Sequence, residues 1–198
     1  TNLLRGSAFI TGAASGKFRR FRITGTIDVA CLSGNASLIR VGLEPSLLAS
    51  HTADRATLGI GQHTALAFAK HGITKLALAD INLEALRTSN AALKGQFPHV
   101  EILTLHLDVR SSSQVKEGIA KVVAQFGRLD IAVNNAGISG SGRQTHEIEN
   151  DEWLGVLDVN LQGVYRCQKE ELAVMVNQEY DNDAARACDD TKNQQGPW

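Results

Sequence analysis

Short apolar stretches alternate with amphipathic stretches along this chain, and that alternation limits its fold more than any other feature. Extended strands are predicted at residues 7–11, 75–80, 100–109 and 129–133. Helices are predicted at residues 60–71, 83–94, 111–126 and 151–176. Because parallel neighbouring strands need a helical crossover, we expect an α/β fold: a doubly wound parallel sheet with helices on both faces.

Local signals mark several helix ends. Gly72 and Gly127 each follow a helical stretch, where glycine can form a left-handed C-cap. Ser111 to Gln114 fits a capping box, in which the first and fourth residues bond reciprocally to backbone N–H groups. The longest predicted helix has one apolar side, which carries Trp153, Leu154, Leu157, Leu161 and Val164.

Polar and glycine residues directly follow the predicted strands. They are Thr11–Gly16, Asp80, Asp108 and Asn134–Gly137. In doubly wound sheets, ligands bind beyond the carboxyl ends of the strands, which meet at one edge. We therefore expect a ligand site at this edge.

Charge and hydropathy argue against several classes of partner. The 20 Lys and Arg residues balance 21 Asp and Glu residues, and a net charge of −1 gives no basic footprint for nucleic acid. No apolar run approaches the roughly 18 to 20 residues that cross a membrane. The first fifteen residues lack a signal-peptide pattern, so we expect a cytoplasmic protein. The chain opens at Thr1 rather than Met, which leaves a missing N-terminal stretch open.

Cysteine usage predicts neither a disulfide framework nor a metal site. Cys31, Cys167 and Cys188 are odd in number and have no metal-ligand spacing. We expect each of them to be inert.

Two segments do not fit the alternating pattern. Residues 17–59 show no clear period and carry a charge of +3, which is compatible with a surface loop or with a basic lid. A structureless loop of this length is unusual in a compact domain. Residues 177–198 contain no Val, Ile or Leu and are predicted to be a disordered acidic tail. We therefore expect one domain over 1–176, interrupted by an insertion at 17–59.

With residues 17–59 set aside, Thr11–Gly16 joins Ile60 and Gly61 in the pattern TGxxxGIG. Asn134–Gly137 reads NNAG, and Asn160–Gly163 reads NxxG. In this order the motifs resemble the short-chain dehydrogenase/reductase family, over residues 7–16 and 60–176. The resemblance implies a Rossmann-like domain that binds NAD(H) and belongs to an oxidoreductase acting on an alcohol or ketone.

The resemblance also assigns cofactor-binding residues. They are Gly12, Ser15, Gly16, Ile60, Gly61, Asp80, Asp108, Val109, Asn134, Ala136 and Gly137. In the glycine motif, Gly12 permits a tight turn, Gly16 lets the backbone approach the cofactor, and Gly61 lets the helix pack on the strand. Taken singly, each glycine is also compatible with ordinary turn chemistry.

The carboxylate of Asp80 is suited to accept both ribose hydroxyls and to repel a 2′-phosphate, so NAD is expected in preference to NADP. Ser15 agrees, because NADP-preferring relatives often carry a basic residue in this loop. The alternative for Asp80 is a helix N-cap. By resemblance Asp108 accepts from the adenine amino group beside the Val109 backbone; its alternative is to cap the helix at Ser111.

Two asparagines have both a functional and a structural interpretation. Asn134 belongs to the wall of the cofactor site by resemblance, or it ties neighbouring strands together. Asn160 resembles the family's proton-relay Asn, the one catalytic position assigned here, which holds a water near the catalytic Lys. Its alternative is a polar residue tolerated within a helix.

The family's catalytic Ser and Tyr-x-x-x-Lys follow a fifth strand, which is not predicted here. We therefore expect the C-terminal strands and these catalytic groups to be missing. Tyr165 and Lys169 have the catalytic spacing, but they lie on the helix of Asn160 and are not expected to be catalytic.

The sequence thus predicts the NAD-binding part of a dehydrogenase that is inactive as this chain. The alternatives are a non-catalytic dinucleotide-binding or interaction module, with 17–59 as a partner-binding lid, and a non-functional product of mis-splicing. The substrate and the oligomeric state, including a homo-oligomer, are left open.

Overall fold

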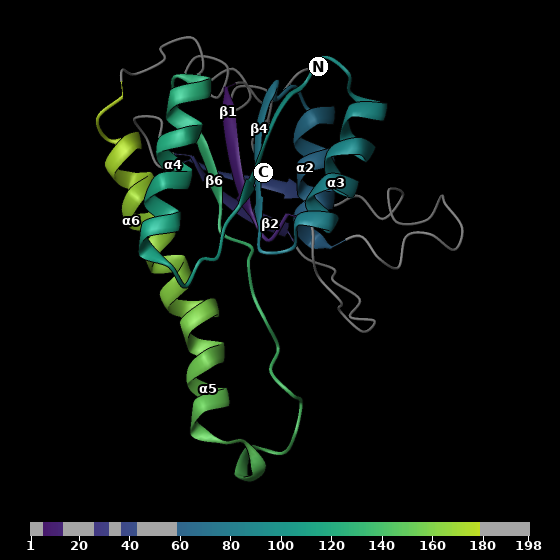
Figure 1. The fold of residues 1–198 in the computed structure, drawn as a ribbon. Helices are drawn as coiled ribbons and strands as arrows, with labels where there is room; N and C mark the ends of the chain where they lie inside the picture. Colours follow the sequence, from purple (N-terminus) through teal and green to yellow (C-terminus); the bar gives the residue numbers. More distant parts are fainter. Residues whose placement is uncertain (1–5, 14–25, 32–36, 43–58, 179–198) are drawn as a thin grey trace, which may run out of the picture.

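The computed structural model describes residues 6–13, 26–31, 37–42 and 59–178. Its centre is a four-stranded parallel sheet in the order β5-β4-β1-β6 (Figure 1). The strands are β5 (Glu101–His106), β4 (Lys75–Asp80), β1 (Ser7–Thr11) and β6 (Ile131–Val133). The predicted parallel sheet is confirmed, although β5 and β6 are shorter than predicted.

Helices cover both faces of this sheet, which confirms the doubly wound α/β prediction (Figure 1). Helices α2 (Ile60–Lys70) and α3 (Leu83–Gln96) lie on one face, and α4 (Ser112–Phe126) and α6 (Val164–Met175) lie on the other. Strand side chains alternate between the faces. Ala8 and Ile10 of β1 join the core beneath α2 and α3, whereas Phe9 joins the core beneath α4 and α6.

The predicted helix ends are largely confirmed. Gly72 and Gly127 have φ values of 108° and 82°, in the left-handed region that glycine adopts without strain. Ser111 Oγ accepts from Gln114 N at 3.4 Å and caps α4. The reciprocal half of the capping box was predicted wrongly, because the Gln114 side chain accepts from the backbone N–H of Asp108 at 2.9 Å.

The long C-terminal helix is interrupted by a π-helical segment. It consists of α5 (Asn150–Leu157), the π-helical η3 (Asp158–Gly163) and α6, and a short 3₁₀ helix, η2 (Thr145–Glu147), precedes it. The prediction of one helix over 151–176 is confirmed in extent. The π-helical turn was not foreseen, because it leaves no periodic signal of its own.

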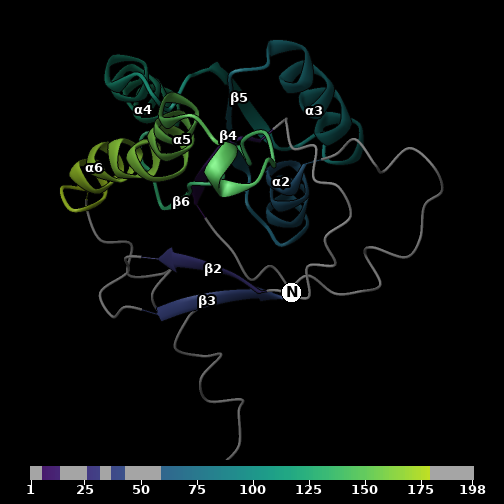
Figure 2. The ribbon, with the colours of Figure 1, turned by 90° about the horizontal axis from the view of Figure 1, so that it is seen from below.

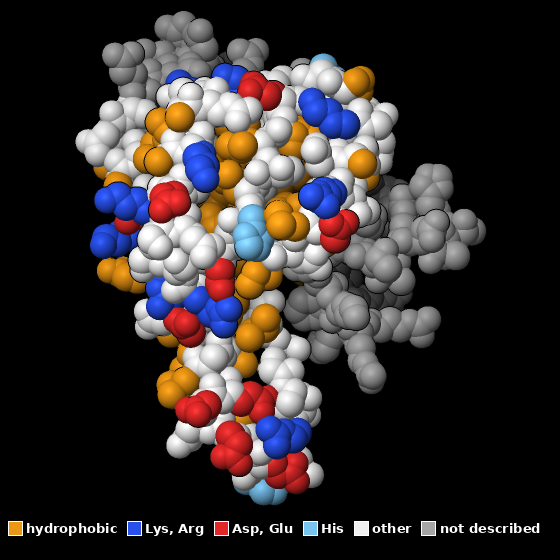
Figure 3. Space-filling view, viewed as in Figure 1, with side chains coloured by type: hydrophobic (Ala, Val, Ile, Leu, Met, Phe, Trp, Pro, Cys, Tyr) orange, Lys and Arg blue, Asp and Glu red, His pale blue; other side chains and the backbone are white. Residues whose placement is uncertain are grey.

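The interpretation of the apolar side of this helix is wrong in part. Trp153, Leu154 and Leu161 are each more than half exposed. Figure 1 shows why: α5 projects beyond the end of the sheet, so the sheet does not cover it. Figure 3 shows hydrophobic side chains along this projection, with charged side chains of both signs at its tip.

The segment 17–59 contains structure that its sequence did not indicate. Strands β2 (Thr26–Cys31) and β3 (Ser37–Gly42) pair antiparallel, in a register from Thr26↔Gly42 to Cys31↔Ser37. They form a sheet of their own (Figure 2), and β2 approaches β6. The prediction of a patternless loop is therefore wrong for these strands. The other residues of 17–58 and the predicted tail from residue 179 lie outside the described residues.

Candidate functional site

The parallel sheet brings the predicted site residues to one edge. Thr11 pairs with Ala79, and Asp80 pairs with His106, so β1, β4 and β5 end side by side. Strand β6 ends next to β1, because Ile10 pairs with Val133. Asp80 is the last residue of β4, and Gly12, Asp108 and Asn134 follow the ends of their strands, at the edge where doubly wound sheets bind ligands.

In the turn after β1, the position of Gly12 leaves no room for a side chain. Gly12 has φ +61°, and a Cβ there would lie 2.8 Å from Ala136 Cα. A Cβ on Gly61 would lie 2.5 Å from Gly12 O and 2.9 Å from Ala13 Cα. The start of α2, the turn and the loop after β6 thus meet backbone to backbone.

The phosphate-binding part of the glycine motif is described only at its two ends. Ser15 and Gly16 lie outside the described residues. Ile60 is the first residue of α2, and Gly59 is its N-cap. Among the described residues, no side chain caps this end of the helix. Backbone N–H groups at such a helix start are suited to bind an anion.

We expect Gly61→Ala to destabilise the fold, because the added methyl group would displace the Gly12 backbone. The cost of such overpacking is about 1–3 kcal/mol in the free energy of unfolding, measured by denaturant titration. The matched control is Gly95→Ala on α3, where a Cβ would meet nothing within 4 Å. The control should be neutral or slightly stabilising. Equal stability of the two variants would contradict the close approach.

Asn135 performs the strand-tying role that was considered for Asn134. Its backbone N–H donates to Thr11 Oγ1 at 3.0 Å, and its Nδ2 donates to Gly12 O at 3.1 Å. Thr11 Oγ1 also accepts from Ala136 N at 3.2 Å. Sequence reasoning missed Thr11 and Asn135, although both stand in the quoted motifs. Two adjacent asparagines do not reveal which one faces the neighbouring strand.

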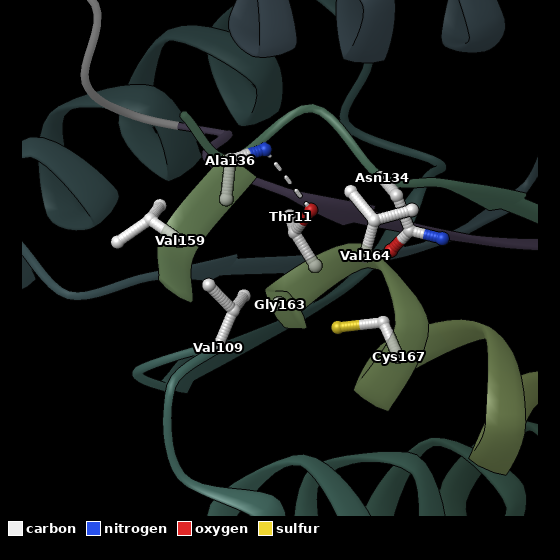
Figure 4. A pocket seen from close by; sticks show the side chains of 8 residues that line it. All are labelled: Thr11, Val109, Asn134, Ala136, Val159, Gly163, Val164 and Cys167. Carbon is white, nitrogen blue, oxygen red and sulfur yellow. Dashed lines mark hydrogen bonds between the residues drawn. The ribbon is translucent and has the colours of Figure 1, made fainter. Parts of the chain in front are cut away.

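Asn134 turns instead toward α6. Its Nδ2 donates to Oε2 of Glu171, a residue that the sequence analysis did not single out, at 2.9 Å. Figure 4 shows Asn134 beside a narrow hollow between the end of β1 and the helix η3–α6. The hollow is lined by Thr11, Val109, Asn134, Ala136, Val159, Gly163, Val164 and Cys167. The hollow is a gap between packed side chains. Three of its lining residues, Val109, Asn134 and Ala136, are predicted cofactor-binding residues, and they lie together there.

Asp80 is buried at the end of β4, with 4% of its surface exposed. Its Oδ1 accepts from Asn82 N at 2.9 Å. The N-cap of α3 is Asn82, whose side chain accepts from Ala85 N at 3.1 Å. The N-cap interpretation of Asp80 is therefore wrong, and the carboxylate stands at the strand end.

Asp108 is held by Arg110. Arg110 Nε donates to Oδ1 of its carboxylate at 3.0 Å, and Arg110 Nη2 donates to Oδ2 at 2.6 Å. This pairing lowers the pKa of Asp108 from its usual value. Ser111 rather than Asp108 supplies the side-chain cap of α4. Val109 is buried against Gly163, where a Cβ would lie 2.7 Å from Val109 Cγ2.

Asn160 is bonded through its side chain within the π-helical segment. Its Oδ1 accepts from Ile138 N, and its Nδ2 donates to Ile138 O, both at 2.8 Å. Gly137 lies beside it, and a Cβ there would lie 3.4 Å from Asn160 Oδ1. The interpretation of Asn160 as a merely tolerated polar residue is wrong, since this side chain anchors the loop after β6. π-Helical turns often occur at functional sites.

Tyr165 and Lys169 point away from the sheet. Cys167 and Glu171 form the buried face of α6. Successive helical residues are about 100° apart, so Tyr165 and Lys169 lie on the opposite side of the helix. Both are exposed, Tyr165 by 61%.

Metal ligands and membrane spans were searched over the described residues. There, no group of three or more His, Cys, Asp or Glu side chains is arranged to hold a metal ion. Nor does any described helix combine the length and apolar character needed to cross a bilayer. Cys167 is a free cysteine and is buried, and burial raises its pKa to about 12.

Residues 56–182 match the family model described as short chain dehydrogenase. A 3beta-hydroxysteroid dehydrogenase of Mediterraneibacter gnavus is 37% identical over 125 residues, 61% of this chain and 42% of that protein. A levodione reductase of Leifsonia aquatica is 36% identical over 120 residues, 61% of this chain and 45% of that protein. This chain thus spans less than half the length of either relative.

The fold resembles that of solved dehydrogenases. The crystal structure of NAD⁺-bound xylitol dehydrogenase superposes with a TM-score of 0.63 at 25% identity, covering 88% of this chain and 50% of that one. The matched family segment begins at residue 56, after the first strand. The place of β1 in the fold therefore rests on its pairing with β4 and β6.

Proposed function

Because this chain belongs to the short chain dehydrogenase family, we propose that its described residues form the NAD-binding half of an oxidoreductase acting on an alcohol or ketone. We further propose that residues 1–176 are one domain with an insertion at 17–59. The match to two relatives, which covers 42% and 45% of their lengths, supports this proposal for the described residues. Their substrates differ by name, so the substrate class beyond alcohol or ketone stays open.

One observation carries the dinucleotide proposal: the absence of room for a Cβ at both Gly12 and Gly61. Each hypothetical Cβ would lie under 3 Å from a backbone atom of the neighbouring segment. Such contact brings the first turn of α2 to the end of β1 without intervening side chains. A diphosphate can then approach the backbone and the positive end of the helix.

The other residues fit a nucleotide that extends along the strand ends. Asp80 would hold the ribose hydroxyls, and Asp108 with the Val109 backbone would face the adenine. Ala136 and Gly137 offer little side-chain bulk along the wall, while Asn160 fixes that wall through Ile138. Bound NAD(H) would supply the hydride chemistry, and the part of these residues is to bind and orient it.

We expect the chain to bind NADH more tightly than NADPH, and Asp80→Ala to reduce that preference by about tenfold, equivalent to about 1.4 kcal/mol. The reason is repulsion between the carboxylate and the 2′-phosphate at a buried strand end. Isothermal titration with each cofactor measures both affinities.

Asp80→Asn is the matched control for this experiment, because it removes the charge and keeps an oxygen that can accept from Asn82 N. Both variants should show the reduced preference for NADH over NADPH. If Asp80→Asn kept the full preference, repulsion by the Asp80 charge would not be the source of that preference. Equal affinities of the unaltered chain for NADH and NADPH would contradict the assignment to NAD.

A non-catalytic dinucleotide-binding module is the second candidate. The solvent-facing orientation of Tyr165 and Lys169 favours it, since no described Tyr–Lys pair with the family spacing faces the site. Cofactor binding without turnover is its expected signature. A cytoplasmic location and a homo-oligomer stay predictions from the sequence.

A further inference from the structure

Helix α6 buries a carboxyl group against the end of the sheet. Glu171 is 2% exposed, one turn after the buried Cys167. Glu171 enters no ion pair within the described residues. The cation Arg166 on the same helix pairs with Asp158 instead, at 2.7 Å. Burying a carboxylate without a cation costs much free energy, whereas burying the neutral acid costs much less.

The hydrogen bonds around Glu171 are incomplete for a carboxylate. Its Oε2 accepts from Asn134 Nδ2 at 2.9 Å. Its Oε1 and the Asn134 Oδ1 are both buried, and neither has a partner in the described part of the chain. Both orphan atoms are acceptors, and they belong to the two residues that already share one bond. A proton on Glu171 Oε1 would make that atom a donor, and Asn134 Oδ1 is the neighbouring residue's acceptor that lacks one.

We propose that Glu171 is, below neutral pH, a neutral carboxylic acid that positions Asn134 through two hydrogen bonds and so holds the Asn134–Gly137 segment against α6. Asn134 Nδ2 donates to Oε2, and the Glu171 hydroxyl on Oε1 donates to Asn134 Oδ1. Glu171 is thus a positioning residue for the loop after β6. Its effect on cofactor binding rests on the proposed function, whereas the proton and the two bonds do not.

The electrostatics around Glu171 agree with a neutral acid. Burial raises the pKa of Glu171 to about 7, although the bond from Asn134 lowers it. Besides burial and this hydrogen bond, no charged group on α4, α6 or the sheet shifts the pKa of Glu171. The neighbouring Cys167 thiol is neutral, because burial raises its pKa to about 12. The charge of Arg166 on the same helix acts in the opposite direction and lowers the pKa of the thiol.

The pH dependence of stability follows from this shift. In the unfolded chain Glu171 ionises at its usual pKa of 4.5, and in the folded chain at about 7. Between these values the folded state binds the extra proton. Stability from this group is therefore full below the unfolded pKa, falls as pH rises through the folded pKa, and is lost above it.

A direct test is a ¹³C NMR titration of the glutamate carboxyl carbons in the full chain, with Glu171→Gln identifying the resonance. We expect Glu171 to titrate near 7, as the buried acid should. Titration at the usual value for a glutamate would overturn the proposal.

Thermal unfolding provides a second readout. Glu171→Gln keeps both hydrogen bonds, because its amide accepts from Nδ2 and donates to Oδ1 of Asn134. Above the folded pKa this variant should melt roughly 5 °C higher than the unaltered chain, and it should lose the fall of Tm with rising pH. The neighbouring Glu170→Gln is the control and should keep that fall. If Glu171→Gln kept it too, the proposal would fail.

NADH titrations at one pH below and one above the folded pKa test the effect on the loop. The unaltered chain should lose affinity at the higher pH, and Glu171→Gln should not. If both lost affinity equally, Glu171 would not position the loop for the cofactor. If no variant bound NADH at either pH, the proposed function would fail, and the NMR and unfolding results would still decide the state of Glu171.

Discussion

The 198-residue chain should show no NAD-linked oxidation of secondary alcohols and no reverse reduction of ketones, although it contains Tyr165 and Lys169 at the catalytic spacing. The basic atom of a general base must lie within about 2.6–3.2 Å of the heavy atom that carries the proton it removes. Tyr165 is 61% exposed on the side of α6 that faces away from the sheet. The expected effect is complete loss of turnover relative to a complete family member assayed in parallel.

Two altered proteins test whether the chain lacks turnover altogether or has only weak turnover. Tyr165→Phe should leave the background rate unchanged, and turnover that this substitution abolished would refute the prediction. A chimera is the positive control, with the C-terminal half of a complete family member following residue 176. Turnover regained in the chimera would identify this chain as the cofactor half. Cofactor binding without turnover in the chimera would favour the non-catalytic module.

Removal of residues 17–59 should stabilise the domain and tighten NADH binding. Gly61 lies against Gly12 and Ala13, so the sequences on either side of the insertion already meet in space. Closing a loop of 43 residues costs about 3 kcal/mol of conformational entropy beyond a constant. We expect the free energy of unfolding, from denaturant titration, to rise by about 2–3 kcal/mol when Gly16 is joined to Ile60.

The hairpin of β2 and β3 makes a matched control necessary. Replacing 17–59 by a Gly/Ser linker of equal length keeps the closure cost and removes the hairpin, which approaches β6. The deletion should be more stable than the linker variant and than the unaltered chain. If the deletion were less stable than the unaltered chain, the hairpin would be an integral part of the fold.

The sequence by itself determined the order of the main elements. The four parallel strands and their helices were predictable because both faces of the sheet are covered, which makes the strands apolar and gives the helices a 3.6-residue period. The site edge followed, since strand ends bear the polar residues. Gly12, Asp80 and Asp108 lie at the carboxyl ends of their strands, as predicted, and Asn160 lies within the predicted helix.

The tertiary structure alone decided which partners polar side chains take in distant parts of the chain. Asn134 and Asn135 are neighbours in sequence, yet Asn135 bonds to β1 and Asn134 bonds to Glu171 on α6. The sequence also did not reveal the exposed side of α5 or the β2–β3 hairpin. Burial and strand pairing depend on which other elements pack against a segment. A periodic pattern records the local backbone conformation, whereas hydrogen-bond partners and burial arise from contacts between segments far apart in the chain.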